Sequence, residues 1–364
     1  MKKRINQMEP WFGEEEREAV NAYLSAGGWL TDFRKTRDFE KAICEYTGVP
    51  YCAVVPNGTI ALQIALMALG IGRGDKVIVP DFTMAASPYA VTLAGAEVVL
   101  VDVDRETMTI NEEKIRPYIK DIKAIMPVSI NGRGYGLDGI CKAYADRVFI
   151  VEDACQSLGS RHEGKHLGSF GHIGVLSFNA FKIISTGQGG ALITHDEKIY
   201  ERIIKIKDFG RSGGRGSAYE ILGMNAKFTD LQAVIGMEQM KKISWRVEKK
   251  KQMYCWYRDL LADCRQVRFF KTNLEDCAPW YMDCLVEDRD ELIRHLDKNG
   301  IEAQPFYPPI HRLNHYAYLH HQDIDFPDSI YLSARGIWLP SSSFLTYEDI
   351  ERVCSQVKSF YRPS

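Results

Sequence analysis

Seven short apolar runs that alternate with helix-like segments constrain the fold of this chain more than any other feature. The runs are rich in Val and Ile and too short for helices, so each is predicted to be a buried strand. They cover residues 52–56, 76–80, 97–101, 123–128, 148–152, 173–178 and 190–194, with helix candidates at 59–69, 87–94, 111–119 and 137–145. This alternation predicts an α/β fold with a mostly parallel seven-stranded sheet and helices on both faces.

The pattern changes near residue 245. Helices are predicted before the sheet at 14–26 and 34–46, and a long charged helix is predicted at 241–264. Beyond that helix, prolines separate short strands and helices up to the C-terminus. We therefore expect a large domain over residues 1–245, which includes the N-terminal helices, and a smaller α+β domain over residues 246–364.

Charge and cysteine content narrow the class of protein. The 46 Lys and Arg residues against 48 Asp and Glu give a formal net charge of −2, so bulk positive charge that would favour nucleic acid is missing. No apolar stretch approaches the roughly 18 residues that cross a membrane. The nine cysteines form no C-x-x-C pair, which predicts a protein without a disulfide framework. The basic residues at the start are not followed by the apolar run of a secretory signal, so we expect a cytoplasmic protein.

Two familiar motifs are set aside. The sequence His-Glu-Gly-Lys-His at 162–166 matches a zinc-protease pattern that requires a helix. Glycines surround it here, so a hairpin is expected instead, and no metal site is predicted. The run 159–165 partly matches a phosphate-binding loop, but His166 stands where the magnesium-binding hydroxyl belongs.

Three features that follow predicted strands carry chemistry. Asn57-Gly58-Thr59 opens an apolar helix, where free amides and the helix dipole favour an anion such as phosphate. Asp153 ends a buried strand and needs a partner, for which a positively charged ring nitrogen of a cofactor would serve. Lys182 follows another buried strand and precedes a glycine-rich run, an environment that lowers a lysine pKa and favours Schiff-base formation.

Each feature also has an ordinary structural explanation: a capping turn, an aspartate that caps the next turn, and an exposed loop lysine. The combination is far more specific. A phosphate cradle, a partner for a pyridinium nitrogen and a Schiff-base lysine are the groups that pyridoxal 5′-phosphate (PLP) requires from a protein. The sequence therefore predicts a PLP-dependent enzyme.

The chain resembles the DegT/DnrJ/EryC1/StrS family of sugar aminotransferases over nearly its whole length. The Lys182 block with residues 187–190 and the block 152–156 form the most specific pair of matches. Further matches lie at 57–59, Pro80 with Thr83, 168–171, 223–233 and 309–311. The resemblance implies the fold-type I architecture of the aspartate aminotransferase superfamily.

The family pattern implies catalytic roles for two residues. Lys182 would bind the cofactor aldehyde as a Schiff base and then move protons, while the cofactor passes between PLP and its amino form, pyridoxamine 5′-phosphate (PMP). Asp153 would pair with the protonated pyridine nitrogen, and Gln156 would lie near the cofactor ring.

Other matching residues imply cofactor binding across two subunits. Gly58, Thr59 and Ser177 would hold the phosphate. Asn225 would reach the phosphate of the neighbouring subunit's cofactor, so the resemblance implies a homodimer with active sites at the subunit interface.

Several positions depart from the family pattern. Met84 stands where an aromatic ring usually stacks on the pyridine, although a thioether also packs on a ring face. Residues 129–132, Ser-Ile-Asn-Gly, replace a common His-Leu-Tyr-Gly near the substrate, and Gln188 replaces a common glutamate. Relatives with histidine at the lysine position are dehydratases, and Lys182 argues against that activity.

The resemblance implies glutamate as amino donor and a 3- or 4-keto-6-deoxyhexose linked to a nucleoside diphosphate as acceptor, in surface-polysaccharide or secondary-metabolite synthesis. Arg211, Arg215, Lys227 and His311 are candidate substrate contacts, although solvated surface charge explains any one of the cations equally well. A smaller phosphorylated ketone as acceptor, or a non-catalytic PLP-binding regulatory protein, are the alternatives.

Overall fold

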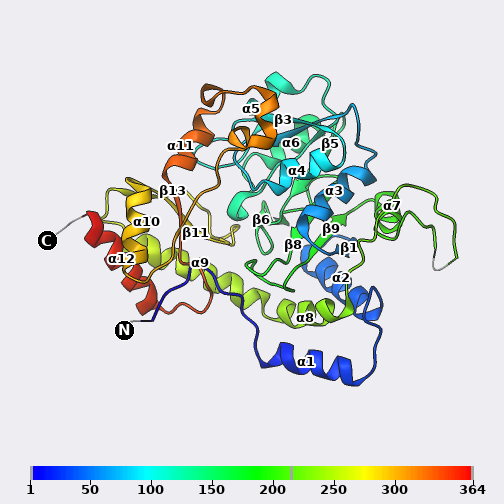
Figure 1. The fold of residues 1–364 in the computed structure, drawn as a ribbon, viewed down its shortest axis with the longest axis horizontal. Helices are drawn as coiled ribbons and strands as arrows, with labels where there is room; N and C mark the ends of the chain where they lie inside the picture. Colours follow the sequence, from blue (N-terminus) through cyan, green and yellow to red (C-terminus); the bar gives the residue numbers. More distant parts are fainter. Residues whose placement is uncertain (1–2, 214–215, 362–364) are drawn as a thin grey trace.

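The computed structural model describes residues 3–213 and 216–361, and its central feature is a seven-stranded sheet (Figure 1). The strand order is β1-β9-β8-β5-β4-β2-β3. The chain forms it from β1 (Tyr51–Val55), β2 (Lys76–Pro80), β3 (Glu97–Val101), β4 (Ala124–Ile125), β5 (Phe149–Asp153), β8 (Ile173–Ser177) and β9 (Gly190–Thr194). Only β9 pairs antiparallel with its neighbours in this sheet. The predicted mostly parallel seven-stranded sheet is confirmed.

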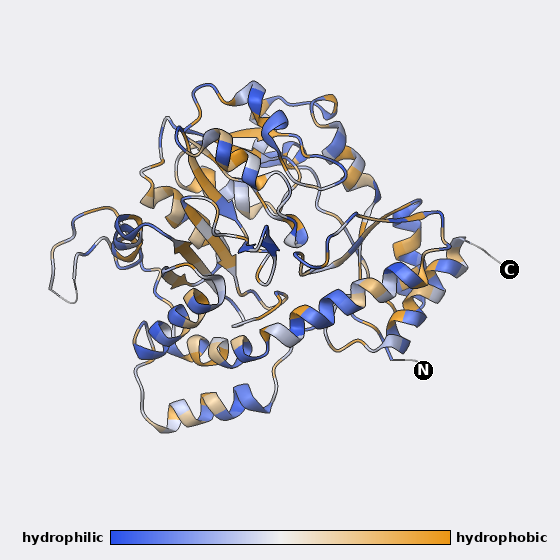
Figure 2. Ribbon diagram, turned by 180° about the vertical axis from the view of Figure 1, so that it is seen from behind, coloured by the Kyte–Doolittle hydropathy of each residue, from blue (hydrophilic) through white to orange (hydrophobic). Residues whose placement is uncertain are grey.

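Side chains that alternate along each strand enter two different cores. Ala53 and Val55 of β1 belong to the core that packs against α3 (Gly58–Ala68), α4 (Ala86–Leu93) and α7 (Glu197–Lys207). Cys52 and Val54 belong to the opposite core, which includes Phe39 of α2 (Arg34–Thr47). Because successive side chains of a strand point to opposite faces, helices cover both faces, and the strands are mainly orange in Figure 2.

The predicted helices are present, and two more join them before residue 242. The remaining helices before residue 242 are α1 (Glu14–Ser25), α5 (Glu112–Ile115) with the 3₁₀ turn Arg116–Tyr118, α6 (Leu137–Tyr144) and α8 (Asp230–Lys241). Pro117 has no N–H to donate to the α-helical ladder, which accounts for the 3₁₀ end of the predicted helix at 111–119. The helices α7 and α8 were not predicted. Helix α8 packs against both α1 and α2, so burial on two sides obscures a single apolar stripe.

A second, smaller sheet lies beyond the long helix α9 (Ile243–Leu260), which runs from α8 towards it in Figure 1. Its antiparallel order is β10-β11-β13-β12. The elements are β10 (Val267–Phe269), β11 (Met282–Val286), α10 (Arg289–Lys298), β12 (Gln304–Pro305), α11 (Pro327–Arg335), β13 (Gly336–Leu339) and α12 (Tyr347–Tyr361), with 3₁₀ turns at Ile310–Arg312, Asn314–Leu319 and Asp323–Asp325. Ile5 pairs with Ile301, so the N-terminal segment packs here. A division at residue 245 stays a prediction.

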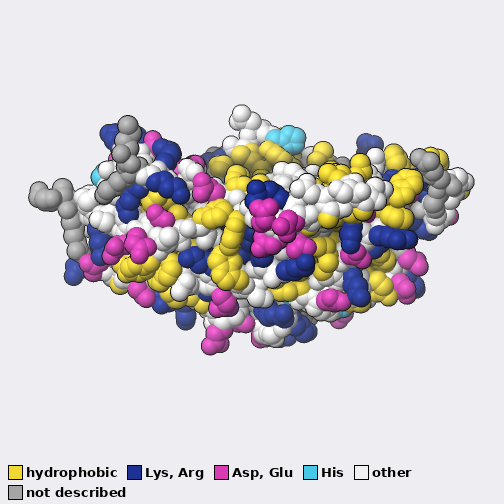
Figure 3. All heavy atoms as spheres, turned by 90° about the horizontal axis from the view of Figure 1, so that it is seen from below, with side chains coloured by type: hydrophobic (Ala, Val, Ile, Leu, Met, Phe, Trp, Pro, Cys, Tyr) yellow, Lys and Arg dark blue, Asp and Glu magenta, His cyan; other side chains and the backbone are white. Residues whose placement is uncertain are grey.

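The histidine-rich segment 162–166 forms the expected hairpin from β6 (Arg161–His162) and β7 (Lys165–His166). Within the described residues, the helices do not reach the length and apolarity that a membrane crossing requires. In Figure 3, side chains of both charge signs are mixed with hydrophobic ones over the face seen from below. That mixture is consistent with the nearly balanced formal charge.

Candidate active site

A cavity of about 290 Å³ lies beyond the carboxyl ends of β1, β2, β5 and β8. Ligands of parallel α/β sheets bind at this edge. Seven of the predicted cofactor and catalytic residues line the cavity together: Gly58, Thr59, Met84, Asp153, Gln156, Ser177 and Lys182. The sheet therefore gathers side chains that are more than 120 positions apart in sequence.

The first wall of the cavity is the start of α3. Asn57 caps the helix, and its side chain accepts the N–H of Ile60 at 2.9 Å. The amides of Gly58 and Thr59 belong to the first helical turn, which has no intrahelical acceptor. A Cβ at Gly58 would lie 2.9 Å from Cys155 Sγ and 3.3 Å from Ser177 Cβ. The missing side chain thus keeps this end of the helix open, beside Thr59 and Ser177.

The second wall carries the buried carboxylate of Asp153. Its Oδ2 accepts the hydroxyl of Ser87 at 2.6 Å, and its Oδ1 accepts the backbone N–H of Cys155 at 3.2 Å. Ser87 in turn contacts Thr83 at 3.1 Å between hydroxyl oxygens. These bonds fix the carboxylate, and Ser87 is a functional candidate that sequence reasoning missed.

Lys182 forms the third wall. Its Nζ lies 3.4 Å from the centre of the Trp280 ring. Burial lowers the pKa of Lys182 to about 8, against the opposing influence of Cys155 and Asp153. At pH 8 about half of this amine is neutral, whereas an unperturbed lysine with a pKa of about 10.4 is almost fully charged. The site therefore presents a nucleophilic amine near neutral pH.

The departures from the family pattern fall into two groups. Met84 lines the cavity and is 48% exposed, so its thioether remains available to a ring. Asn131, from the segment 129–132, is buried and exchanges hydrogen bonds with the backbone of Tyr281 at 2.6 and 2.9 Å. Its N–H also donates to Gln156 Oε1 at 2.9 Å, so this segment supports Gln156 from behind.

Three aromatic residues of the cavity come from the C-terminal part of the chain. Trp280, Tyr281 and Tyr307 line the cavity opposite the sheet, and the Trp280 and Tyr281 ring centres are 3.9 Å apart. Sequence reasoning missed all three. Their only signal was the aromatic runs at 280–281 and 306–307, which is equally typical of a core.

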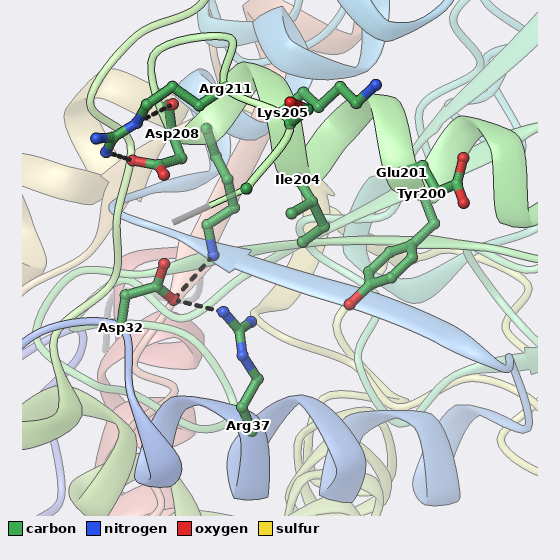
Figure 4. Close-up of a pocket in the computed structure, with 11 residues that line it drawn as sticks. Asp32, Arg37, Tyr200, Glu201, Ile204, Lys205, Asp208 and Arg211 are labelled. Carbon is green, nitrogen blue, oxygen red and sulfur yellow. Dashed lines mark hydrogen bonds and ion pairs between the residues drawn. The ribbon is translucent and has the colours of Figure 1, made fainter. Parts of the chain in front are cut away.

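Three other predicted residues gather elsewhere, around Asp208. Arg211 and Lys227 both form ion pairs with the Asp208 carboxylate, and exposed Asn225 pairs with the Asp208 backbone. Arg211 lines a separate cavity of about 660 Å³ (Figure 4). There the carboxylate of Asp32 contacts Arg37 and buried Lys207, both at 3.3 Å. Arg215 lies outside the described residues.

The imidazole of His311 lies between two carboxylates and contacts both of them. Its Nδ1 lies 2.8 Å from Asp81 Oδ2, and its Nε2 lies 3.1 Å from Asp323 Oδ1. Its backbone N–H also donates to Asp81 at 2.8 Å. His311 is absent from the described lining of the Lys182 cavity. The bonds tie the 3₁₀ segment 310–325 to the end of β2, which leads to Met84.

Comparison with known proteins places this geometry in a family. The model of the DegT/DnrJ/EryC1/StrS aminotransferase family matches residues 10–358. This chain belongs to that family. A GDP-perosamine synthase of Escherichia coli O157:H7 is 32% identical over 365 residues, 99% of each chain.

Solved structures agree with the assignment. A DegT/DnrJ/EryC1/StrS aminotransferase from Brucella abortus superimposes with a TM-score of 0.87 at 30% identity over 95% of each chain. A putative sugar aminotransferase from Streptococcus pneumoniae, solved in PLP- and PMP-forms, shares the fold at TM-score 0.91 and 24% identity over 98% of each chain. The predicted family, its fold-type I architecture and its PLP-dependent aminotransferase activity are confirmed.

In this family member, replacing His311 by Phe is expected to make stability less dependent on pH. Burial alone would lower the pKa of His311, but hydrogen bonds to Asp81 and Asp323 outweigh burial and raise it. A raised pKa stabilises the fold fully below the unfolded value of about 6.5, and this contribution is lost as pH rises through the folded value. Phe keeps the stacking on Phe326 and the backbone hydrogen bond to Asp81. It removes the charged partner of the buried Asp81 carboxylate, which costs about 3–5 kcal/mol.

Thermal unfolding of both proteins between pH 6 and pH 9 checks this. The difference in melting temperature between the wild type and His311→Phe should be largest at pH 6 and become smaller as the pH rises. Arg312→Ala is the control, because the Arg312 guanidinium pairs with the exposed carboxylate of Asp323, and such exposed pairs contribute about 0–1 kcal/mol. The same difference in melting temperature at every pH would contradict the stabilisation of charged His311 by the two carboxylates.

Proposed function

We propose that this aminotransferase binds PLP in the Lys182 cavity and moves an amino group from glutamate to a keto-sugar linked to a nucleoside diphosphate. The observation that carries the proposal is the convergence of three groups on one cavity. These are an amine with a lowered pKa, a fixed carboxylate and the amide end of a helix. Together they match the aldehyde, the ring nitrogen and the phosphate of one cofactor.

The residues present fit that cofactor. The open helix end at Gly58, the Thr59 and Ser177 hydroxyls and the helix dipole would hold the phosphate. Asp153 would face the ring nitrogen and Lys182 the aldehyde, while Met84 and Gln156 would border the ring. When bound, PLP supplies an electron sink for the carbanion that forms at the reacting carbon.

Lys182 has two tasks in this proposal. Its neutral form is the nucleophile that binds the aldehyde covalently, and its lowered pKa supplies that form near pH 8. With the cofactor bound, the amine of Lys182 would also be the group that moves a proton at the α-carbon of the donor. Proton transfer of this kind contributes about 10²–10⁴-fold in rate.

Asp153 keeps the ring nitrogen charged. A carboxylate at hydrogen-bonding distance favours the protonated form of a basic nitrogen. Ser87 and the Cys155 amide already orient Asp153, so the carboxylate would be preorganised to stabilise positive charge on that nitrogen.

The names of two relatives indicate which amino acceptor to test first. The Escherichia coli and Caulobacter vibrioides relatives, at 32% and 33% identity, are GDP-perosamine synthases. We therefore expect a sugar linked to a nucleoside diphosphate, with GDP as the first nucleotide to test. Such a reaction belongs to surface-polysaccharide or secondary-metabolite sugar synthesis in the cytoplasm.

Product analysis tests this directly. The enzyme with PLP is incubated with ¹⁵N-glutamate and a panel of keto-sugars linked to GDP, dTDP or UDP, together with a smaller phosphorylated ketone. We expect ¹⁵N in an amino-sugar nucleotide by mass spectrometry. Label only in the aminated phosphorylated ketone would favour the alternative acceptor, and cofactor binding without any labelled product would favour a regulatory protein.

We also propose a homodimer with shared sites. Exposed Asn225, together with Arg211 and Lys227, lies apart from the chain's own Lys182 cavity. Phe181 and Met84 at that cavity are 45% and 48% exposed, which leaves apolar surface for a second copy to cover. These observations support the contribution of Asn225 to the cofactor site of a neighbouring copy.

Subunit mixing checks the shared site. Lys182→Ala and Asn225→Ala should each be impaired alone, whereas a co-refolded mixture of the two should regain activity. In a mixed dimer, one site combines the intact Lys182 of one subunit with the intact Asn225 of the other. A mixture no more active than its components would contradict sharing.

A further inference from the structure

One face of α9 carries two buried cations that the proposed reaction does not use. Arg246 and Lys250 lie four residues apart, one helical turn, and are 3% and 2% exposed. Four-residue spacing places side chains on the same side of a helix. Arg246 donates to the carbonyl of Ile183, next to Lys182, and Lys250 donates to the carbonyl of Trp280, which lines the Lys182 cavity.

Lys250 bonds only to backbone carbonyls among its described partners. Its Nζ donates to Trp280 O at 2.9 Å and to Ser341 O. Buried lysines normally need a carboxylate to offset the loss of hydration. Burial and the neighbouring Arg246 instead lower the pKa of Lys250 to about 7. The neutral amine has two N–H groups, which match the two carbonyl oxygens.

The Trp280 carbonyl belongs to the residue whose ring covers Lys182. That ring lies 3.4 Å from Lys182 Nζ, and its Nε1–H donates to Phe181 O at 2.7 Å. On the other side of Lys182, Arg246 donates to Ile183 O at 2.8 Å. The carbonyl before Lys182 thus accepts a hydrogen bond from Trp280, and the carbonyl after it accepts one from Arg246 of α9. The backbone of Trp280 is in turn bound to α9 through Lys250.

We propose that Lys250 is a positioning residue that keeps the Trp280 ring over the Lys182 amino group. A long side chain that reaches two carbonyls links α9 to two segments at once, the one before β11 and the one after β13. If that link is lost, the ring keeps its indole hydrogen bond and its contact with Tyr281, but the Trp280 backbone is no longer tied to α9. Water then reaches the amine, and Lys182 loses the burial that lowers its pKa.

The inference rests on the proposed role of Lys182 as the cofactor-binding amine, but it is tested on the lysine itself. Competitive acetylation of the full chain freed of cofactor, with acetic anhydride between pH 6 and pH 11, reports the pKa of Lys182 by peptide mass spectrometry. We expect a pKa of about 8 in the wild type. In Lys250→Met, it should move towards the ordinary value of about 10.4.

Two variants separate positioning from general loosening. Tyr257→Phe removes a buried hydrogen bond from the same helix to Pro340 O, at 2.9 Å, next to Ser341, but leaves Trp280 untouched. It should lower stability without changing the labelling of Lys182. Lys250→Arg keeps the donors and should retain most of the wild-type labelling profile.

The outcomes are distinct. An unchanged Lys182 profile in folded Lys250→Met, or an equal shift in Tyr257→Phe, would overturn the proposal. If Lys250→Met does not fold, Lys250→Leu takes its place, because leucine also has no N–H to donate to the two carbonyls, and the same criteria apply. A wild-type enzyme that fails to transfer amino groups but shows the expected shifts would count against the proposed function alone.

Discussion

Lys182→Ala is expected to lower the rate of amino transfer by at least about 10²–10⁴-fold, the contribution of a positioned proton-transfer group alone. The loss should be larger in practice, because the same side chain is the proposed covalent ligand of the cofactor. We expect the enzyme with bound PLP to be yellow, and the variant should lose that absorbance band. Steady-state transfer from glutamate and absorbance spectra check both effects.

Lys165→Ala is the matched control for this prediction. Lys165 lies exposed on β7 and outside the described lining of the cavity, so both activity and colour should persist. Retention of full activity in Lys182→Ala would show that another amine does the work. A wild-type chain that stays colourless after incubation with PLP would contradict Schiff-base formation with the cofactor.

Asp153→Asn should lower kcat/KM by about 10²–10³-fold, the range for loss of one preorganised electrostatic contact. Asn is close in shape and still accepts a hydrogen bond from Ser87, but it carries no negative charge to keep a ring nitrogen protonated. The expected effect is therefore on reaction rate, with bound cofactor still present. Measuring cofactor content and kcat/KM in parallel distinguishes a slower reaction from a loss of bound cofactor.

Ser87→Ala provides a graded comparison. It removes only the 2.6 Å hydrogen bond to Asp153 Oδ2 and keeps the charge, so its loss in kcat/KM should be smaller than that of Asp153→Asn. Wild-type kcat/KM in Asp153→Asn would contradict the role of the carboxylate.

The sequence predicted the central sheet and the residues at its edge for one physical reason. A buried strand is a short apolar run, and polar residues directly after such runs, like Asp153 and Lys182, must lie at the carboxyl edge. The strand β4 was predicted too long, because only Ala124 and Ile125 form its ladder with β2 and β5. Helix α8 was missed because its environment is buried on two sides.

The rest of the site depends on packing between segments far apart in the chain. Trp280 and Tyr307 come from the C-terminal part, and the aromatic run that contains each is equally typical of a core. His311 matches a family motif, yet its partners Asp81 and Asp323 are set by how the 3₁₀ segment folds onto β2. The two carbonyls that Lys250 contacts are likewise invisible to pattern analysis, since backbone atoms carry no sequence signal.

The central claim is that the side chain of Lys182 holds PLP covalently. Borohydride reduction of the purified enzyme with PLP, followed by proteolysis and peptide mass spectrometry, tests it most directly. The account predicts one phosphopyridoxyl-modified peptide with the modification on Lys182, and none when glutamate is added first in excess. A modification on another lysine, or none at all in the absence of glutamate, would contradict it.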